Sequence, residues 1–343
     1  MIEFKNTKFN LIFILIILSY YNTYGQDVHF SQRLSSDRDK NPAFLNSFDG
    51  NWQFASVHRQ QWQVIGVPYT TSSILFTHNF YTPIRALEVF GGLQYTNDKS
   101  GSANLLINRM ALNLGATYQT DMGRFTLATS NNIYNKNFNQ KGLTFPSQYD
   151  RNRGGFNENL ASGENFAGES INYYQLNIGL RWEHKLSDEW RVNSGIYTQN
   201  INTHQESFLD QSNQKQISYG IQLIAIRQTR EEMSLEPYFS FHRIANASES
   251  IAGLALGFDT ESFGVINEIK PFLFLRTGIN RNTDAVILGS YFNVRDFDFA
   301  LSYDANVSDL RLASNYRGGF ELSLIYTAKA KRLKNRRVPC VRY

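Results

Sequence analysis

Apolar and polar side chains alternate one by one along many short segments of this chain, and this period of two constrains its fold most strongly. In Tyr174–Glu183 the even positions carry large apolar or aromatic residues, whereas the odd positions are mostly polar. Phe297–Asp304 repeats the pattern. Such alternation places successive side chains on opposite faces of a β-strand. The sequence therefore predicts an all-β fold built from strands with one apolar and one polar face.

The polar faces of these strands carry charged and amide groups that would be costly in a dry core. We expect them to face a water-filled lumen after the sheet closes into a barrel, while the apolar faces meet lipid. The predicted lumen-facing residues are Gln175, Asn177, Arg181, Glu183, Asp298, Ser302 and Glu321.

The N-terminal residues predict export from the cytoplasm. Lys5 and Lys8 precede the apolar run Leu11–Leu18, and small or polar residues follow as far as Gly25. This order is typical of a cleavable secretory signal, whereas a membrane-anchoring helix needs ~20 apolar residues. We predict a signal peptide over residues 1–25, with cleavage after Gly25.

Composition favours a membrane barrel over a helical membrane protein. Hydrophobic residues make up 42% of the chain, and mean hydropathy is −0.39. No apolar run after residue 25 is long enough for a spanning helix, and only helices and closed barrels satisfy their backbone groups in lipid. The single cysteine, Cys340, cannot close an internal disulfide. The net charge of +4 is modest, and we expect no nucleic-acid partner for an exported chain.

The period-two segments predict an antiparallel, up-and-down transmembrane barrel of about fourteen strands over residues 51–328. The count is open by two, because Glu261–Lys270 is ambiguous. Residues 26–50 are predicted to form a periplasmic N-terminal segment, and residues 329–343 a basic periplasmic tail. The expected strands lie near 52–58, 69–80, 88–96, 108–120, 124–134, 174–183, 190–202, 217–226, 234–244, 250–259, 271–277, 284–292, 297–304 and 320–326.

The segments between strands predict short periplasmic turns and longer cell-surface loops. Asp121–Gly123 and Leu186–Glu189 are tight turns, whereas Lys136–Ser170 is a long polar stretch. Gln205–Lys215 and Arg243–Glu249 are expected to be shorter surface loops. Aromatic residues near segment ends are expected at the two headgroup levels of the membrane, namely Trp62, Tyr95, Tyr118, Trp182, Trp190, Tyr197 and Tyr291.

The sequence offers little for catalysis or metal binding. The six histidines are scattered without metal-ligand spacing, and neither a nucleophile elbow nor a phosphate-binding glycine loop occurs. Glu183, Asp298 and Glu321 resemble a general acid/base group, but lumen lining or pairing with Arg181 is the favoured interpretation. Asp304–Asp309 resembles the start of a calcium loop, but it lacks the turn glycine and the closing glutamate, so a hairpin turn is favoured. We therefore predict no enzyme, no metal and no cofactor.

The C-terminal tail is strongly basic and contains no acidic residue. One interpretation is a solvated tail near anionic headgroups, and the other is a docking peptide for a periplasmic partner. Both stay open, because the tail ends in an apolar and aromatic box. The candidate partner-binding residues are Lys331, Arg332, Arg336, Arg337, Pro339, Cys340, Arg342 and Tyr343.

Several motifs at the two ends of the chain are more specific than the barrel pattern. At the predicted mature start and first hairpin they are Gln26–Gln32, Asn41–Phe44, Arg59–Trp62 and Pro68–Thr71. In the closing third they are Arg281–Ile287, Ala300–Leu310, Ala313–Asn315 and Gly319–Tyr326. These motifs resemble the PorP/SprF family of type IX secretion system outer-membrane proteins of the Bacteroidota. The end Val338–Tyr343 is similar to the family's terminal Pro-Cys-Pro-Arg-Phe box, with Val341 and Tyr343 replacing a proline and a phenylalanine.

The resemblance implies an outer-membrane component that acts beside the secretion channel. Its expected role is secretion and surface anchoring of a large adhesin of the gliding type, or linkage of the outer membrane to the periplasmic ring and its lipoprotein. Outer-membrane lipid and lipopolysaccharide are the other expected partners. The alternative from a different class is a passive, porin-like diffusion channel.

Overall fold

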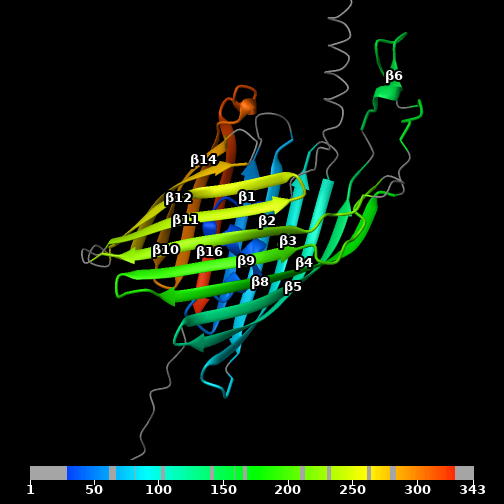
Figure 1. The fold of residues 1–343 in the computed structure, drawn as a ribbon. Helices are drawn as coiled ribbons and strands as arrows, with labels where there is room; N and C mark the ends of the chain where they lie inside the picture. Colours follow the sequence, from blue (N-terminus) through cyan, green and yellow to red (C-terminus); the bar gives the residue numbers. More distant parts are fainter. Residues whose placement is uncertain are drawn as a thin grey trace, which may run out of the picture.

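The computed structural model describes residues 29–61, 67–80, 82–101, 105–139, 143–157, 159–164, 168–208, 213–229, 233–260, 264–278 and 283–328. Within them, fourteen strands form one closed antiparallel barrel (Figure 1). None of the helices in these ranges has both the length and the apolar character needed to cross a membrane. The predicted signal peptide and the basic tail lie outside the described residues.

Each barrel strand pairs with the next barrel strand along the chain, so that β5 pairs with β8 because β6 and β7 lie outside the barrel. The last strand, β16, pairs with β1 and closes the barrel. The barrel strands are β1 Trp52–Gln61, β2 Tyr69–Phe80, β3 Leu87–Ser100, β4 Leu105–Thr120, β5 Gly123–Asn137, β8 Ser170–Lys185, β9 Trp190–Gln199, β10 Ser218–Gln228, β11 Met233–Ile244, β12 Ala247–Asp259, β13 Glu268–Thr277, β14 Thr283–Val294, β15 Phe297–Asn306 and β16 Arg317–Ala328. β6 Tyr149–Asp150 and β7 Gly155–Phe156 form a separate small hairpin. The prediction of a fourteen-stranded up-and-down barrel is confirmed.

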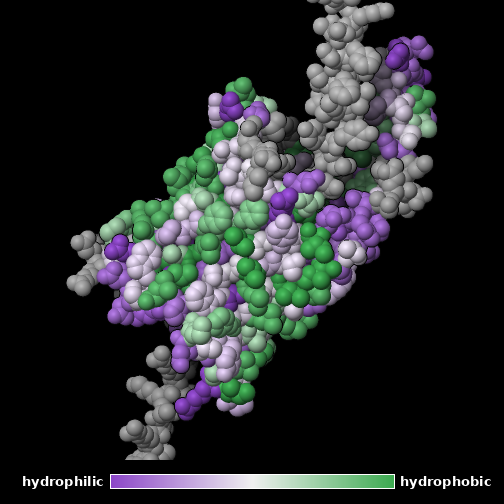
Figure 2. All heavy atoms as spheres, viewed as in Figure 1, coloured by the Kyte–Doolittle hydropathy of each residue, from purple (hydrophilic) through white to green (hydrophobic). Residues whose placement is uncertain are grey.

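The alternation in sequence becomes an apolar outside and a polar inside. In β4, Leu112 and Leu114 are 46% and 50% exposed, whereas Asn113 between them is 1% exposed. Figure 2 shows apolar residues gathered over the barrel wall. Large exposed apolar surfaces are unfavourable in water, so this wall fits a lipid surrounding.

The two ends of the barrel differ in their connections. At the end where β1 begins and β16 ends, the connections are 81–86, 121–122, 186–189, 229–232, 260–267 and 295–296. At the opposite end they are 62–68, 101–104, 138–169, 200–217, 245–246, 278–282 and 307–316. Outer-membrane barrels have short periplasmic turns and longer surface loops, so we assign the first end to the periplasm. The expectation of a surface loop over Arg243–Glu249 is wrong, because β11 and β12 pair up to Ile244 and Ala247.

The N-terminal segment departs most from expectation. Residues 26–50 are predicted to be periplasmic, but the described part from His29 onward enters the barrel (Figure 1). It forms α2 (Arg33–Lys40) and a 3-10 turn η1 (Pro42–Phe44). α2 ends because Asn41 precedes a proline and is extended, with φ −124° and ψ 108°. Two other 3-10 turns, η2 (Pro146–Gln148) and η4 (Asp309–Arg311), lie in surface connections.

Two aromatic residues expected at the headgroup level are instead buried inside the barrel. Tyr197 is 4% and Tyr291 is 7% exposed. The Tyr197 hydroxyl lies 3.0 Å from Nδ1 of His242, and the Tyr291 ring packs 4.8 Å from that of Phe272. Nearness to a strand end does not identify a girdle residue, because the alternation decides which face a ring occupies.

Candidate functional site

The N-terminal segment and the lumen wall around it form the most extensive polar site of the described structure. We call residues 29–46 the lumen plug. Almost all plug residues from Phe30 onward are buried or half-buried. Plug side chains or backbone groups hydrogen-bond to residues of β1, β3, β4, β8, β9, β10, β11, β12, β13, β15 and β16. The plug therefore spans the lumen from wall to wall.

The first residues of the plug are bound by the two last strands. The Glu321 carboxylate of β16 accepts the backbone N–H groups of Ser31 at 2.8 Å and of Gln32 at 3.1 Å. The Gln32 amide donates to the Glu321 carbonyl oxygen at 2.9 Å and to the Ser302 hydroxyl at 3.3 Å. These contacts satisfy backbone and side-chain groups that would otherwise be buried without partners.

A charge cluster surrounds the same turn. Arg59 of β1 forms ion pairs with Asp304 at 2.7 Å and with Glu321 at 3.1 Å. Arg276 of β13 reaches Asp304 at 3.0 Å. The Ser31 hydroxyl donates to Asp304 at 2.6 Å and accepts from the two arginines at 2.7 and 2.9 Å. Two guanidinium groups thus face two carboxylates, which is the kind of pairing that makes buried charge tolerable.

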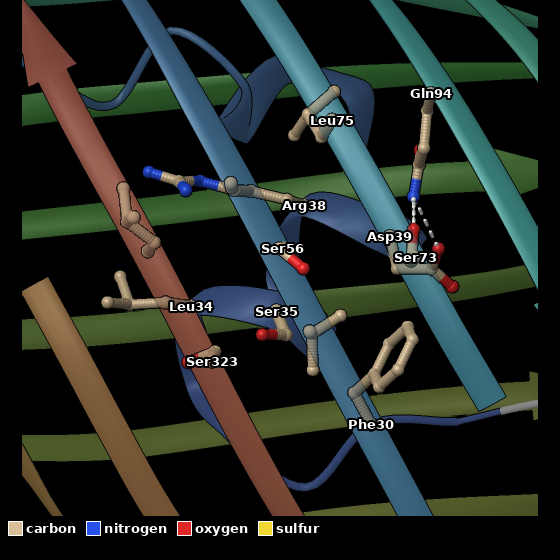
Figure 3. Close-up of a pocket in the computed structure, with 13 residues that line it drawn as sticks. Phe30, Leu34, Ser35, Arg38, Asp39, Ser56, Ser73, Leu75, Gln94 and Ser323 are labelled. Carbon is tan, nitrogen blue, oxygen red and sulfur yellow. Dashed lines mark hydrogen bonds between the residues drawn. The ribbon is translucent and has the colours of Figure 1, made fainter. Parts of the chain in front are cut away.

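α2 is tied to strands on two sides of the barrel by its acidic and basic side chains. Asp37 accepts from the Gln222 amide at 2.9 Å and from the Tyr238 hydroxyl at 2.7 Å. Lys40 forms an ion pair with Glu249 at 2.6 Å. Arg33 pairs with Glu236 at 3.0 Å, and Asp39 pairs with Arg109. Figure 3 shows α2 against the wall, with Gln94 donating to Asp39 at 3.1 Å.

Two glycines of the wall make room for the end of the plug. A Cβ on Gly179 of β8 would overlap the Asn41 side-chain oxygen, and one on Gly195 of β9 would lie 2.5 Å from the Phe44 ring. The Asn41 amide uses this space to donate to Gln222 at 2.9 Å. The Phe44 ring centre lies 5.7 Å from the guanidinium carbon of Arg181. The wall is therefore shaped for this segment.

The seven residues predicted to line the lumen all belong to the inward-facing alternation. Ser302 and Glu321 are opposite neighbours and both contact Gln32, whereas Arg181 pairs with Glu183 at 3.2 Å. Gln175 donates to Asn177 at 2.8 Å, and Asp298 accepts from Asn293 at 2.5 Å. Five of the seven are buried, namely Gln175, Asn177, Arg181, Ser302 and Glu321, whereas Glu183 and Asp298 are half-buried.

Sequence reasoning missed the plug and its charged partners Arg59, Arg276 and Asp304. Two sequence motifs pointed to this region, because Arg59–Trp62 and Asn41–Phe44 both belong to the motifs of the family resemblance. The candidate partner-binding residues of the tail lie outside the described residues, and their role stays a prediction.

The described residues provide no cluster of three His, Cys, Asp or Glu side chains suited to a metal ion. Asp304, the first residue of the segment that resembles a calcium loop, is instead ion-paired inside the barrel. The Asn306 side chain accepts the Ser308 backbone N–H at 3.0 Å, as in an Asx turn.

A large cavity, which we call the vestibule, lies at the periplasmic end of the plug. Its volume is about 1360 Å³. Its inner end is formed by α2 and Phe44, and its rim by residues 49–51 and the β2–β3 connection. A far smaller, partly apolar cavity of about 30 Å³ separates Phe30 and Leu34 from Leu75 (Figure 3).

Comparison with solved structures supports the fold alone. The chain is similar to the Pseudomonas putida toluene transporter TodX, with 10% identity, 87% of this chain and 94% of that chain covered, and a TM-score of 0.50. A deltaS2 mutant of the TodX monoaromatic hydrocarbon channel gives 10% identity, 86% and 94% coverage, and a TM-score of 0.51. No curated protein sequence matches the chain.

The family comparison is more specific. The family described as "Type IX secretion system membrane protein PorP/SprF" matches residues 22–326, which include the plug and nearly the whole barrel. This agrees with the outer-membrane barrel fold and with the resemblance in the sequence motifs. The chain belongs to the PorP/SprF family of type IX secretion system membrane proteins and is an outer-membrane β-barrel.

Proposed function

We propose that this barrel acts as a binding scaffold in type IX secretion, either holding an exported adhesin at the cell surface or linking the outer membrane to the periplasmic ring. The observation that carries the proposal is the lumen plug. The barrel wall hydrogen-bonds its own N-terminal segment along most of its circumference, so the lumen is filled by protein. A filled lumen suits a binding scaffold better than a pore.

The surface of the barrel offers a place for a partner outside the cell. The 138–169 connection carries the β6–β7 hairpin away from the barrel wall (Figure 1). Its Tyr149, Phe156 and Leu160 are large apolar residues with exposed side chains. Exposed apolar and aromatic groups at a loop tip favour protein contact. We infer that an adhesin would contact this hairpin.

The periplasmic side supports the second branch. The basic residues of 329–343 give an anionic partner a complementary charge, and the apolar box at 338–343 gives it an anchor. Deletion of 329–343 tests this branch, because docking through the tail requires that secretion and complex assembly fail. Unchanged secretion and assembly would remove the tail from the proposal.

The decisive experiment is a deletion of the barrel gene, scored for the set of proteins released to the medium and the cell surface. The proposal predicts loss of at least one secreted or surface-held protein, with rescue by the intact chain. A tagged chain extracted in mild detergent should retain a secretion component or an adhesin. Recovery of the barrel alone, together with normal secretion in the deletion strain, would refute the scaffold role.

The alternative function is a passive, porin-like channel. It requires a continuous aqueous path, and the plug lies across that path. Liposome swelling in sugar solutions separates the two functions, because a porin admits small sugars rapidly and a plugged scaffold does not.

A further inference from the structure

Arg38 of α2 is a buried cation without a bonding partner. Its side chain lines the vestibule, the residue is 8% exposed, and its Nε and Nη1 atoms have no hydrogen-bond acceptor within the described structure. None of the ion pairs between described residues involves Arg38. Figure 3 shows the Arg38 side chain extending away from Asp39. A buried guanidinium is normally paired, so its partner is expected from outside the described chain.

The rest of the vestibule wall is also short of negative charge. The basic residues that line it are Arg33, Arg38, Arg85, Arg124, Lys185, Arg191 and Lys270, and the acidic ones are Asp37, Asp49, Glu88, Glu183 and Glu236. Three of these acids are already neutralised within the wall. Glu88 pairs with Arg124 at 2.7 Å, Glu183 with Arg181 at 3.2 Å, and Glu236 with Lys270 at 2.6 Å.

The unpaired cations are placed at the two ends of the cavity. Arg38 lies at the inner end, and Arg85 and Arg191 are exposed residues of the periplasmic part of the wall. Neither Arg85 nor Arg191 forms an ion pair with another described residue. Asp49 at the rim is the one exposed acid of the lining that has no such pair among these residues. Unpaired positive charge in a recessed, low-dielectric cavity attracts anions.

The size and lining of the vestibule indicate a peptide instead of a small ion. Small-molecule pockets measure roughly 300–1,000 Å³, and the vestibule, at about 1360 Å³, is larger. Apolar side chains also line it, among them Leu34, Phe44, Phe48, Phe80, Ile84 and Leu87. Alternating carboxylate and apolar side chains of an extended peptide would match both kinds of surface.

We propose that the vestibule binds an extended acidic peptide segment of a partner in the periplasm. Arg38 forms a bidentate ion pair with one carboxylate at the inner end, and Arg85 and Arg191 bind further carboxylates near the opening. This inference rests on the proposed scaffold function and names the chemistry of its periplasmic partner.

The test uses the purified full-length chain in lipid nanodiscs and a fluorescent peptide of alternating glutamate and leucine. Binding is followed by fluorescence anisotropy at low and high salt. We expect saturable binding that weakens with salt, and Arg38→Gln should weaken it at least about tenfold, because it removes the buried charge of the pair. Arg311→Gln is the control for the same change of residue, since Arg311 is an exposed arginine at the cell-surface end.

Loss of folding would not explain weaker peptide binding by Arg38→Gln. Arg38 makes no hydrogen bond that its replacement would break, so Arg38→Gln should keep the heat-modifiable gel mobility of a folded barrel. Arg85→Gln/Arg191→Gln is a second variant at exposed positions, and it too should weaken binding.

Three outcomes would overturn the proposal. These are absence of binding, unchanged binding by Arg38→Gln, and displacement of the peptide by vesicles containing phosphatidylglycerol, which would make the vestibule a lipid phosphate site. Peptide binding is measured on the purified barrel, whereas the scaffold function is tested by the secretion phenotype of a barrel deletion. A failure of the peptide to bind would therefore overturn the vestibule proposal alone. A deletion strain with normal secretion would overturn the scaffold function instead.

Discussion

Replacing Glu321 with alanine removes the carboxylate that holds the first turn of the plug. Glu321 is 0% exposed, and its carboxylate accepts two plug N–H groups and one Arg59 N–H group. After the substitution, Arg59 keeps Asp304 as its carboxylate partner, while the N–H groups of Ser31 and Gln32 lose their acceptor. We expect the plug to detach more often while the strands stay paired.

The size of the effect follows from the two hydrogen bonds between the plug backbone and the carboxylate. Each hydrogen bond to a charged group contributes about 1.5–3 kcal/mol, so the two together contribute about 3–6 kcal/mol. Because every 1.4 kcal/mol is tenfold, the ratio of docked to undocked plug should fall by roughly a hundredfold to roughly ten-thousandfold. Asp188→Ala is the control, because Asp188 lies in an exposed periplasmic turn, where its pair with Lys185 contributes little.

Amide hydrogen exchange, read by mass spectrometry, measures this ratio directly. Peptides covering residues 31–36 should exchange faster in Glu321→Ala than in the parent, while peptides from β4 and β5 keep their protection. Equal protection of residues 31–36 in both proteins would show that the carboxylate does not hold the plug, and the reasoning would be wrong.

Three further predictions concern the wall, the lipid face and the surface hairpin. Gly179→Ala should displace Asn41 and speed exchange at residues 41–46, and unchanged exchange would contradict the fitted wall. Leu112→Arg should destabilise the barrel in lipid vesicles by about 2–4 kcal/mol in urea unfolding, whereas Leu312→Arg in a surface connection should change little; equal effects would argue against a lipid-facing Leu112. Deleting residues 145–164 should leave a folded, heat-modifiable barrel that captures less adhesin, and loss of the folded form would show that the hairpin is structural.

The strands could be predicted because their signal is local. Tyr69–Phe80 was bounded correctly as β2, since a period of two is visible within the segment itself. β3 and β4 run further than the alternation suggested, to Ser100 and from Leu105. Pairing in the ladder continues there although the alternation is lost, because the end of β3 is polar on both faces and the start of β4 is apolar on both faces. The surface connection after β5 was predicted from its length and its polar composition.

The plug could not be predicted in the same way, because its residues look like those of a solvated segment. Ser31 and Gln32 are buried by partners about 290 positions away along the chain, and only closure of the barrel brings them together. The same applies to Tyr291, whose place inside the barrel depends on register. The contact between the plug and the barrel wall is made largely by polar residues, so no apolar pattern in the sequence could reveal it.

Single-channel conductance in planar bilayers tests the central claim, that the barrel is filled by its own N-terminal segment. The intact purified chain should show no steady large conductance, and a chain lacking residues 29–46 should show one if its barrel still folds. A steady large conductance from the intact chain, equal to that of the shortened one, would contradict the account.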